Sequence, residues 1–306
     1  MRFLSWLFGG EEKLGRGLDE LAARLKLSVE ELKAVKPRYH EFTLPKRSGG
    51  RRKIAAPEAE LKALQRRILR RLLARLPVHP AATGFCRGES IVSHARRHQG
   101  QAVVIHLDLV DFFPSTSAKR VERYFQGIGW DHEAAKLLTK ICTHDGGLPQ
   151  GAPTSPILSN LVNYRLDARI AAYARRLNIV YSRYADDITF SYADSEANEV
   201  GNVRAGSLCR FVRLVAAAGG YRVHRKKGSI RRSHQRQLVA GLVVNQKVQL
   251  PRETRRWLRA VEHRASRRPR LAEALDQSSP PPTLTPSQLE GWRALVRMIE
   301  QQGQET

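Results

Sequence analysis

The 306-residue chain carries 53 Lys and Arg against 29 Asp and Glu, a formal net charge of +24, and 42% of its residues are hydrophobic. This composition supports globular folding, excludes disorder over most of the length, and makes nucleic acid the expected partner ahead of an anionic membrane surface. No stretch has the roughly 20 apolar residues that span a bilayer, and the three widely separated cysteines give neither a disulfide framework nor a zinc pattern.

The N-terminal sequence MRFLSWLFGGEEK has only a short apolar run and no small-residue cleavage site. We therefore interpret it as a packed N-terminal segment rather than a signal peptide. With so few cysteines, a reducing cytoplasm is the expected location.

The positive charge is unevenly distributed along the chain. Residues 36–76 hold 13 Lys and Arg against 3 Glu, and residues 221–270 hold 16 against 2 acids. Residues 101–200 hold 10 against 12 acids. A uniformly basic, solvated surface would not exclude the central third, so the sequence predicts an acidic centre between two basic regions.

Two short helices are predicted over residues 18–36, the second with Ser28 as N-cap and Glu31 completing a capping box. Such a pair is either a helix-turn-helix DNA reader or a simple packing unit, and we favour the packing unit. A basic hairpin that turns at Gly49-Gly50 is expected next.

Residues 58–76 are typical of an amphipathic helix. Its predicted apolar face consists of Leu61, Leu64, Ile68, Leu72 and Leu76. Arginines occupy the opposite face, either as a solvated surface or as a contact for a nucleic-acid backbone.

A buried strand is predicted around residues 103–110, where Asp108 stands alone among Val, Ile and Leu. Helical residues 118–141 follow. The stretch YSRYADDITFS, residues 181–191, alternates like a strand pair and predicts a hairpin that carries Asp186 and Asp187.

The loop HDGGLPQGAPTSP leads into a predicted helix over about residues 156–177, with Ser155 as N-cap and Pro156 at the first helical position. Further predicted elements are a helix at 203–218, a strand pair in 236–245, a basic helix from 251, a linker at 278–286 and a closing amphipathic helix.

The isolated and paired aspartates indicate a metal site. A carboxylate within an apolar strand is costly unless it is paired or binds a cation, and the adjacent Asp186 and Asp187 raise one another's pKa. If the two strands are neighbours in one sheet, these carboxylates and Asp108 can hold two Mg²⁺ ions about 4 Å apart, as in phosphoryl transfer. Alone, an Asp-Asp pair in a hairpin is more often a surface turn, so this interpretation needs the other motifs.

Those motifs occur in order as LDLVDFF (107–113), LPQGAPTSPILSN (148–160) and YADD (184–187). With them, the chain from about residue 39 to its C-terminus resembles the reverse transcriptases, specifically the bacterial retron-type group. The segments LPKRSGGRRKIAAP, HRKKG and RQLVAGLVVN resemble that group's fingers hairpin and later motifs.

The resemblance implies an α+β right-hand polymerase fold, with fingers, a palm whose antiparallel sheet carries the catalytic aspartates, and a helical thumb. The implied domains are an N-terminal helical segment (1–38), fingers (39–100), palm with fingers insertions (101–235), and palm end with basic helical thumb (236–306).

By the same resemblance, Asp108, Asp186 and Asp187 are catalytic and hold two Mg²⁺ ions, assisted by the carbonyl of Leu109. Phe113 stands where the family has the side chain that excludes a 2′-hydroxyl and so selects dNTPs, with an ordinary core phenylalanine as the alternative. The implied nucleotide-binding residues are Lys46, Arg52, Asp111, Phe113, Gln150, Gly151 and Lys227.

Basic fingers and thumb would grip an RNA/DNA hybrid, and binding should weaken steeply with salt. The implied nucleic-acid-binding residues are His98, Arg252, Arg255, Arg256 and Arg259.

Two elements connect the chain with retrons. SIVSHARRH (90–98) resembles the NAxxH element with His94 in place of Asn, and VAG (239–241) resembles VTG with Ala240 in place of Thr. The resemblance implies a structured noncoding RNA as template and primer, priming from the 2′-hydroxyl of a guanosine, a branched single-stranded DNA product, and a separate effector protein in anti-phage defence.

Several alternatives remain. The length leaves no room for an RNase H domain or an intron maturase's extra domains, but a group II intron-like or CRISPR-associated reverse transcriptase stays open. So do a non-catalytic RNA-binding derivative of the fold and a DNA-binding regulator that uses residues 18–36. Phe113 argues against a viral-type RNA-dependent RNA polymerase, which must accept ribonucleotides.

Overall fold

The computed structural model describes residues 15–45, 49–193, 199–225, 227–271 and 285–303. A central sheet has the strand order β4-β5-β3-β6, with β7 also paired to β3, and its neighbouring strands are antiparallel. The strands are β3 (Val103–Val110), β4 (Val180–Tyr184), β5 (Asp187–Tyr192), β6 (Arg222–Val223) and β7 (Ser229–Arg232). An antiparallel sheet that occurs together with many helices confirms the predicted α+β class.

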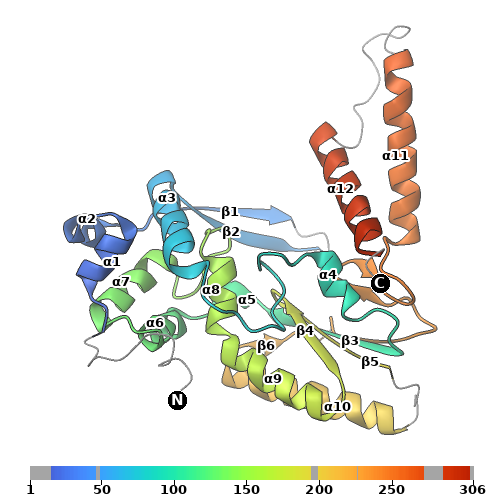
Figure 1. The fold of residues 1–306 in the computed structure, drawn as a ribbon, viewed down its shortest axis with the longest axis horizontal. Helices are drawn as coiled ribbons and strands as arrows, with labels where there is room; N and C mark the ends of the chain where they lie inside the picture. Colours follow the sequence, from blue (N-terminus) through green and yellow to red (C-terminus); the bar gives the residue numbers. More distant parts are fainter. Residues whose placement is uncertain (1–14, 46–48, 194–198, 226, 272–284, 304–306) are drawn as a thin grey trace.

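The side chains of β3 alternate between the two faces of the sheet. Val103, Ile105 and Leu107 are buried in one cluster with residues of α9 (Tyr164–Arg176) and α10 (Glu199–Ala218), which cover one side of the sheet (Figure 1). Because side chains of a strand alternate between faces, His106 and Asp108 point to the other side.

The predicted helix over 156–177 is in fact two helices, α8 (Ser155–Val162) and α9. They meet at Asn163, which is buried and whose amide donates to the Ser159 carbonyl oxygen at 2.8 Å and to the Tyr221 hydroxyl at 2.8 Å. Ser155 is not the N-cap. It lies in the first turn, where its hydroxyl donates to the Pro149 carbonyl oxygen at 2.7 Å.

The N-terminal lobe packs as a second hydrophobic cluster. Its elements are α1 (Leu18–Leu25), α2 (Val29–Ala34), α3 (Ala59–Ile68), the π-helix η2 (Leu69–Leu73), α6 (Ala118–Gly127) and α7 (His132–Cys142). The capping box of Ser28 and Glu31 is confirmed. Leu18, Leu21 and Leu25 of α1 are buried in this cluster, which supports the packing unit over a DNA reader.

The basic hairpin is also confirmed. Strands β1 (Tyr39–Pro45) and β2 (Arg51–Pro57) are antiparallel, and Gly49 and Gly50 adopt φ values of +85° and +82° before β2. These left-handed conformations favour glycine because it lacks a Cβ.

The apolar face of the helix over 58–76 differs from the predicted one in its last turns. The π-helical turn η2 contains one residue more than an α-helical turn and shifts the residues after it around the helix, so Leu73 is fully buried while Leu72 and Leu76 are half-buried. Two arginines of the opposite face cap α1, because Arg67 and Arg71 donate to carbonyl oxygens at its C-terminal end. The side chains of Arg67 and Arg71 therefore have a structural role at the end of α1.

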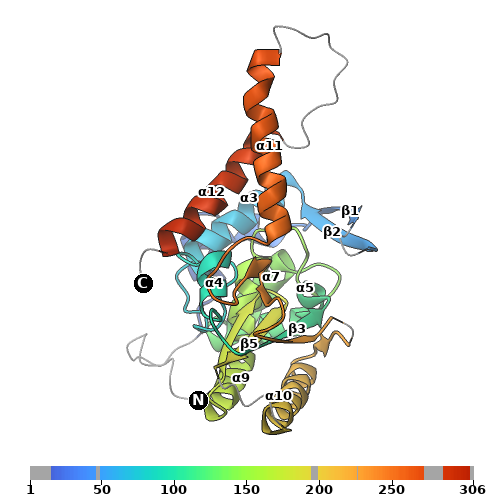
Figure 2. The same ribbon diagram turned by 90° about the vertical axis from the view of Figure 1, so that its right-hand side faces the viewer.

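A third cluster joins α4 (Ile91–Arg96), the hairpin of β8 (Leu238–Val239) and β9 (Leu242–Val243), and α12 (Pro286–Gly303). Between β8 and β9, Ala240 and Gly241 have φ values of +48° and +83°, as expected of a two-residue hairpin turn. Helix α11 (Arg252–Leu271) stands beside α12 and projects from the body (Figures 1 and 2), and Trp257 meets Trp292 edge to face at 5.6 Å.

Two sequence predictions fall outside the described residues: the packed N-terminal segment and most of the linker at 278–286. The division into four domains stays a prediction. Across the described ranges, no helix is long and apolar enough to cross a membrane.

A buried ion pair ties α9 to β4 beneath the sheet. The Arg183 guanidinium donates to both carboxylate oxygens of Asp167 at 2.7 and 2.6 Å, and both side chains are fully buried. Its third nitrogen donates to the carbonyl oxygen of Ala185 at 3.0 Å. Arg183 thereby fixes the turn that precedes Asp186.

Removing one partner of this pair leaves a buried charge without its counter-ion. We predict that Asp167→Ala lowers the free energy of unfolding by about 3–5 kcal/mol. The double variant Asp167→Leu/Arg183→Met should lose less than the single variant, since no lone charge remains buried. Urea denaturation checks both, and a loss under about 1 kcal/mol for Asp167→Ala would contradict the assignment.

Candidate active site

The sheet brings the predicted catalytic aspartates together. Asp108 near the end of β3 is the direct cross-strand partner of Asp187 at the start of β5, and directly opposed residues have Cβ atoms about 4.5–5.5 Å apart. Asp186 occupies the turn before β5, after Ala185 with its left-handed φ of +57°. The backbone N–H of Leu109 donates to the Asp186 carbonyl oxygen at 3.0 Å, which connects β3 to this turn.

The electrostatics of the turn show how close these carboxylates are. Burial and, after it, the negative charges of Asp187 and Asp108 raise the pKa of Asp186 to about 6, against the opposing effect of Lys227. Asp108 is itself 8% exposed. Like charges crowded in a partly buried position are the arrangement that a bound cation stabilises.

Two cationic or titratable groups contact these acids. The Lys227 ammonium lies 3.3 Å from Oδ1 of Asp108, and Nε2 of His106 lies 3.3 Å from Oδ1 of Asp187. Burial lowers the pKa of His106, but the hydrogen bond and charge of Asp187 outweigh it, so the pKa is raised.

The three aspartates supply hard oxygen ligands of the kind that Mg²⁺ prefers. Their donor chemistry, the pairing of Asp108 with Asp187 and the adjacent position of Asp186 fit a divalent metal site. In the described residues, the His, Cys, Asp and Glu ligand atoms that lie within 4.8 Å of one another belong to Glu41, His144 and Asp145 instead. Lys53 already forms ion pairs with Glu41 and Asp145 there, at 2.9 and 3.1 Å, so a lysine offsets part of the negative charge of this second cluster.

The other predicted nucleotide-binding residues lie on several different elements. Asp111 and Phe113 follow β3 in and before α5 (Phe112–Ser115), with Asp111 exposed at φ +47° and Phe113 half-buried. Arg52 is exposed on β2, with no ion-pair partner in the described ranges. Lys46 lies outside them.

Gly151 does require a close backbone approach, although the approaching group is protein. A Cβ at this position would lie 2.9 Å from the carbonyl oxygen of Ala55, and φ is +131°. The neighbouring Gln150 accepts a hydrogen bond at its carbonyl oxygen from the Ala55 N–H at 2.9 Å. The LPQGAPTSP loop is therefore joined to the basic hairpin, and contact of these residues with a nucleotide stays a prediction.

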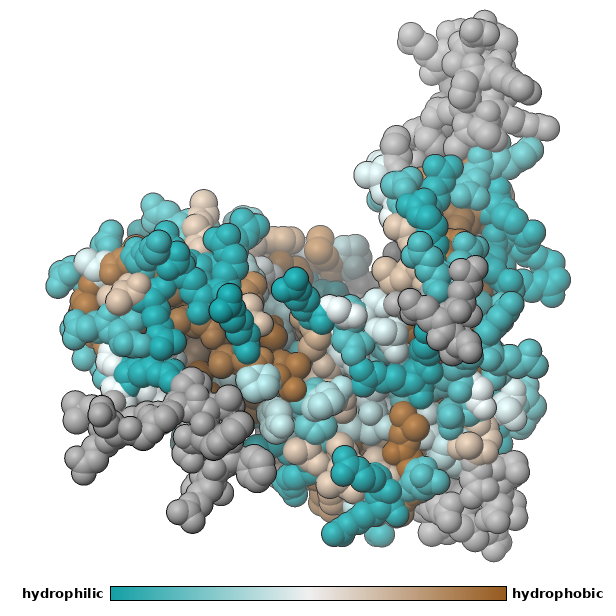
Figure 3. Space-filling view, in the orientation of Figure 1, coloured by the Kyte–Doolittle hydropathy of each residue, from teal (hydrophilic) through white to brown (hydrophobic). Residues whose placement is uncertain are grey.

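The predicted thumb arginines share one helix face. Arg252, Arg255, Arg256 and Arg259 are all exposed, and at 3.6 residues per turn their directions fall within about 100° of arc. Leu258 and Val261 are buried on another side of α11. Figure 3 shows hydrophilic side chains over the described part of this helix. The face is open to a partner.

His98 is placed differently from its prediction. Its side chain is fully buried, with Nδ1 2.7 Å from the Ser191 hydroxyl and Nε2 2.6 Å from the Ser182 hydroxyl. Both ring nitrogens are used within the protein, which contradicts direct contact with nucleic acid. His98 instead anchors the end of α4 to β4 and β5.

His94, the departure from the NAxxH pattern, extends the same buried chain. Its Nδ1 lies 2.7 Å from the Thr83 hydroxyl and 3.2 Å from the Ser182 hydroxyl. Its Nε2 is buried without a hydrogen-bond partner in the described part of the chain, and its ring meets Tyr184 of the YADD motif at 5.5 Å.

Sequence reasoning missed two residues near the aspartates. His106 precedes Asp108 by two positions, and the period of a strand could have placed it on the same face. Phe85 is exposed, yet its ring lies near Phe113 and Tyr184. The available sequence signal for Phe85 was its position as an aromatic residue directly after Gly84 and before a polar loop.

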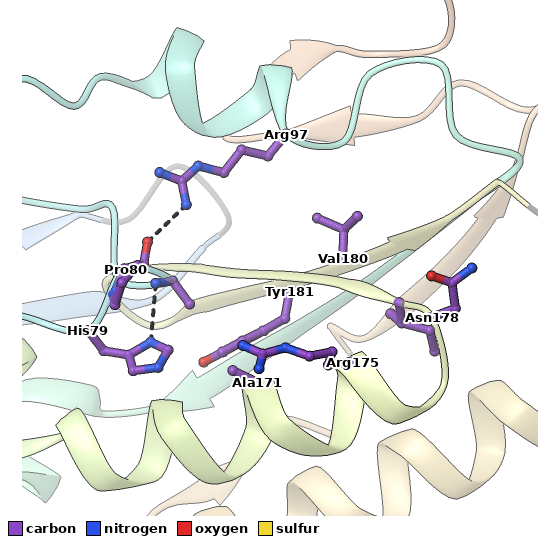
Figure 4. A pocket seen from close by; sticks show the side chains of 10 residues that line it. His79, Pro80, Arg97, Ala171, Arg175, Asn178, Val180 and Tyr181 are labelled. Atoms are coloured by element: carbon purple, nitrogen blue, oxygen red, sulfur yellow. Dashed lines mark hydrogen bonds between the residues drawn. The ribbon is translucent and has the colours of Figure 1, made fainter.

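A cavity of about 340 Å³ lies away from the aspartates, between α9, β4 and the segment 79–81 (Figure 4). The guanidinium of Arg97 lines it but donates to the Pro80 carbonyl oxygen at 2.9 Å and pairs with Glu89. The lining contains no group of the catalytic set, so the candidate active site is the aspartate cluster.

Residues 44–247 match the family described as reverse transcriptase (RNA-dependent DNA polymerase). The chain belongs to the reverse transcriptase family. It is 38% identical to the retron Mx162 reverse transcriptase of Myxococcus xanthus, over 92% of this chain and 64% of that protein. It is 41% identical to the retron Mx65 reverse transcriptase of the same organism, over 81% and 63%.

A third relative is the retron Ec86 reverse transcriptase of Escherichia coli, 36% identical over 80% of this chain and 77% of that protein. These relatives place the chain in the retron-type group of reverse transcriptases, although it spans less than two thirds of the two Myxococcus proteins. The telomerase of Candida albicans in complex with a telomeric RNA fragment has a TM-score of 0.50 at 11% identity, over 78% of this chain and 51% of that one. This likeness supports the right-hand polymerase fold.

The buried position of His98 in this reverse transcriptase predicts a pH dependence of stability. Burial lowers its pKa to about 3, whereas in the unfolded chain it takes up a proton near pH 6.5. Between these values the unfolded state binds more protons, so stability falls as the pH falls. Between pH 7 and pH 5, His98 contributes a loss of about 2 kcal/mol.

The variant His98→Gln should therefore show a flatter pH profile of unfolding free energy between pH 7 and pH 5. His132→Gln is the matched control, because it makes the same substitution at a side chain that is 74% exposed. Parallel profiles for wild type and His98→Gln would contradict the buried, neutral state of His98.

Proposed function

We propose that this chain is an RNA-directed DNA polymerase that uses two Mg²⁺ ions held by Asp108, Asp186 and Asp187. The observation that carries the proposal is the cross-strand pairing of Asp108 with Asp187, beside Asp186, in a chain of the reverse transcriptase family. Three neighbouring carboxylates can bind two divalent ions.

The metal ions, when bound, would activate the primer hydroxyl and stabilise the charge that develops on the transferred phosphate and the leaving pyrophosphate. The role of the protein is to hold and orient the aspartates. Arg183 fixes the turn of Asp186 through Ala185, and the Leu109 N–H ties that turn to β3. Lys227, an ammonium group beside Asp108, is suited to interact with the departing pyrophosphate.

Nucleotide binding and selection follow from the residues around the aspartates. Arg52, exposed on β2, is available to a triphosphate as a planar fork of donors, with Lys46 as a second cation. Phe113, half-buried in α5, would contact the sugar of the incoming dNTP and exclude a 2′-hydroxyl.

The substrate duplex would lie between the basic hairpin and α11. The face of Arg252, Arg255, Arg256 and Arg259 suits a phosphate backbone, and an RNA/DNA hybrid is recognised mainly through its shape and backbone. These contacts position the duplex without selecting its sequence.

The likeness to retron reverse transcriptases supports a more specific task. We propose that the template and primer are one structured noncoding RNA, that synthesis starts from a 2′-hydroxyl, and that the product is a branched single-stranded DNA used with an effector protein against phage. DNA joined to a copurifying RNA through a 2′ linkage would support this, and DNA joined only through 3′ ends would contradict it.

The polymerase proposal is tested by primer extension with Mg²⁺, dNTPs and a primed RNA template. Asp187→Asn keeps the side-chain volume but removes a charge from the metal site, so we predict a loss of at least about a thousandfold in extension rate. Asp19→Asn, which changes an exposed acid at the start of α1, is the matched control and should extend normally. Absence of extension by the wild type, or extension that survives Asp187→Asn, would refute the proposal.

A further inference from the structure

Phe85 combines backbone strain with exposure. Its φ is +64°, in the left-handed region that bulky residues rarely adopt, at a cost of about 1–3 kcal/mol. Its side chain is also 43% exposed. Core packing does not explain a large apolar side chain that is strained and still reaches solvent.

The loop that carries Phe85 is fixed against the catalytic turn. A Cβ on Gly84 would lie 2.9 Å from the backbone nitrogen of Ala185, so only glycine permits this approach. The buried amide of Asn160, from α8, donates to the Gly84 carbonyl oxygen at 2.7 Å. The Thr83 N–H donates to the Arg183 carbonyl oxygen at 2.9 Å. Phe85 is therefore held in place relative to the turn before Asp186.

The ring of Phe85 contacts the two aromatic residues that flank the aspartates. Its centroid lies 6.1 Å from that of Phe113 and 6.0 Å from that of Tyr184, both in tilted arrangements. Phe113 is also in edge contact with the buried Phe112 at 5.5 Å. Phe113 thus has one aromatic neighbour from the core and a second from the solvent-exposed loop.

We propose that Phe85 is a positioning residue for nucleotide selection, which holds the ring of Phe113 in the orientation that excludes a ribose 2′-hydroxyl. This inference rests on the proposed polymerase function and extends it to a residue outside the recognised motifs. Phe113 packs against both hydrophobic clusters, but without Phe85 its ring would have no aromatic neighbour outside the core to fix its orientation towards the sugar. The ring of Phe85, on a rigid loop, restricts the orientation of the Phe113 ring. This role accounts for the strained backbone conformation of Phe85.

The test compares dNTP with rNTP incorporation opposite the same RNA template. Phe85→Gly removes the ring and also relieves the left-handed strain, so the variant should unfold at the same temperature as the wild type or higher. We predict that its selectivity for dNTP over rNTP falls by about 3- to 10-fold, the size expected for one aromatic pair. The change should appear mainly as faster rNTP incorporation.

Two further variants complete the experiment. Phe85→Tyr retains the ring and should keep selectivity within about twofold of the wild type. Lys26→Gly changes another non-glycine residue with positive φ, +52°, at the end of α1, and should leave selectivity unchanged.

The outcomes separate this inference from the proposed function. A wild type that extends no primer refutes the polymerase itself. A wild type that extends, together with a Phe85→Gly variant of unchanged selectivity, overturns the positioning role. A lowered unfolding temperature with unchanged selectivity would show that Phe85 serves only the fold.

Discussion

A shift of one residue between β3 and β5 would turn Asp108 towards α9 and α10, because side chains of a strand alternate between the two faces of a sheet. The observed register prevents this. Val103, Ile105, Leu107 and Leu109 fill the helix-covered core, and this burial forces Asp108 to the other face, where it pairs with Asp187. The apolar residues around the aspartate thus decide where its charge lies.

The distribution of charge follows from the same arrangement. The net charge of +24 would repel the magnesium ions that a polymerase needs, unless acids gather at one point. The sheet provides that point, where burial and like charge raise the pKa of Asp186 to about 6. The exposed arginines of α11 and the basic hairpin remain available for a polyanion. The acids and the exposed arginines thus lie on different elements, as the proposed binding of metal ions and nucleic acid requires.

The sequence was sufficient for those features that depend on short-range patterns. The strand around Asp108, the hairpin at Gly49-Gly50 and the capping box at Ser28 all follow from alternation, turn chemistry or capping. The motif order indicated the fold and the aspartates. These signals need no knowledge of distant residues.

The features that sequence reasoning missed depend on contacts between distant parts of the chain. The buried pair of Asp167 and Arg183 joins α9 to β4, and nothing local distinguishes its members from surface charges. His98 matched a motif linked to RNA, but its role depends on two serines of the sheet. The strain at Phe85 becomes visible only when the loop lies against the catalytic turn.

The most direct test of the account is the location of the metal ions in a crystal of the protein with primed RNA template, an unreactive dNTP analogue and Mn²⁺. Anomalous scattering should show two Mn²⁺ ions about 4 Å apart, bound by Asp108, Asp186 and Asp187. Manganese bound at Glu41, His144 and Asp145 with none at the three aspartates would contradict it.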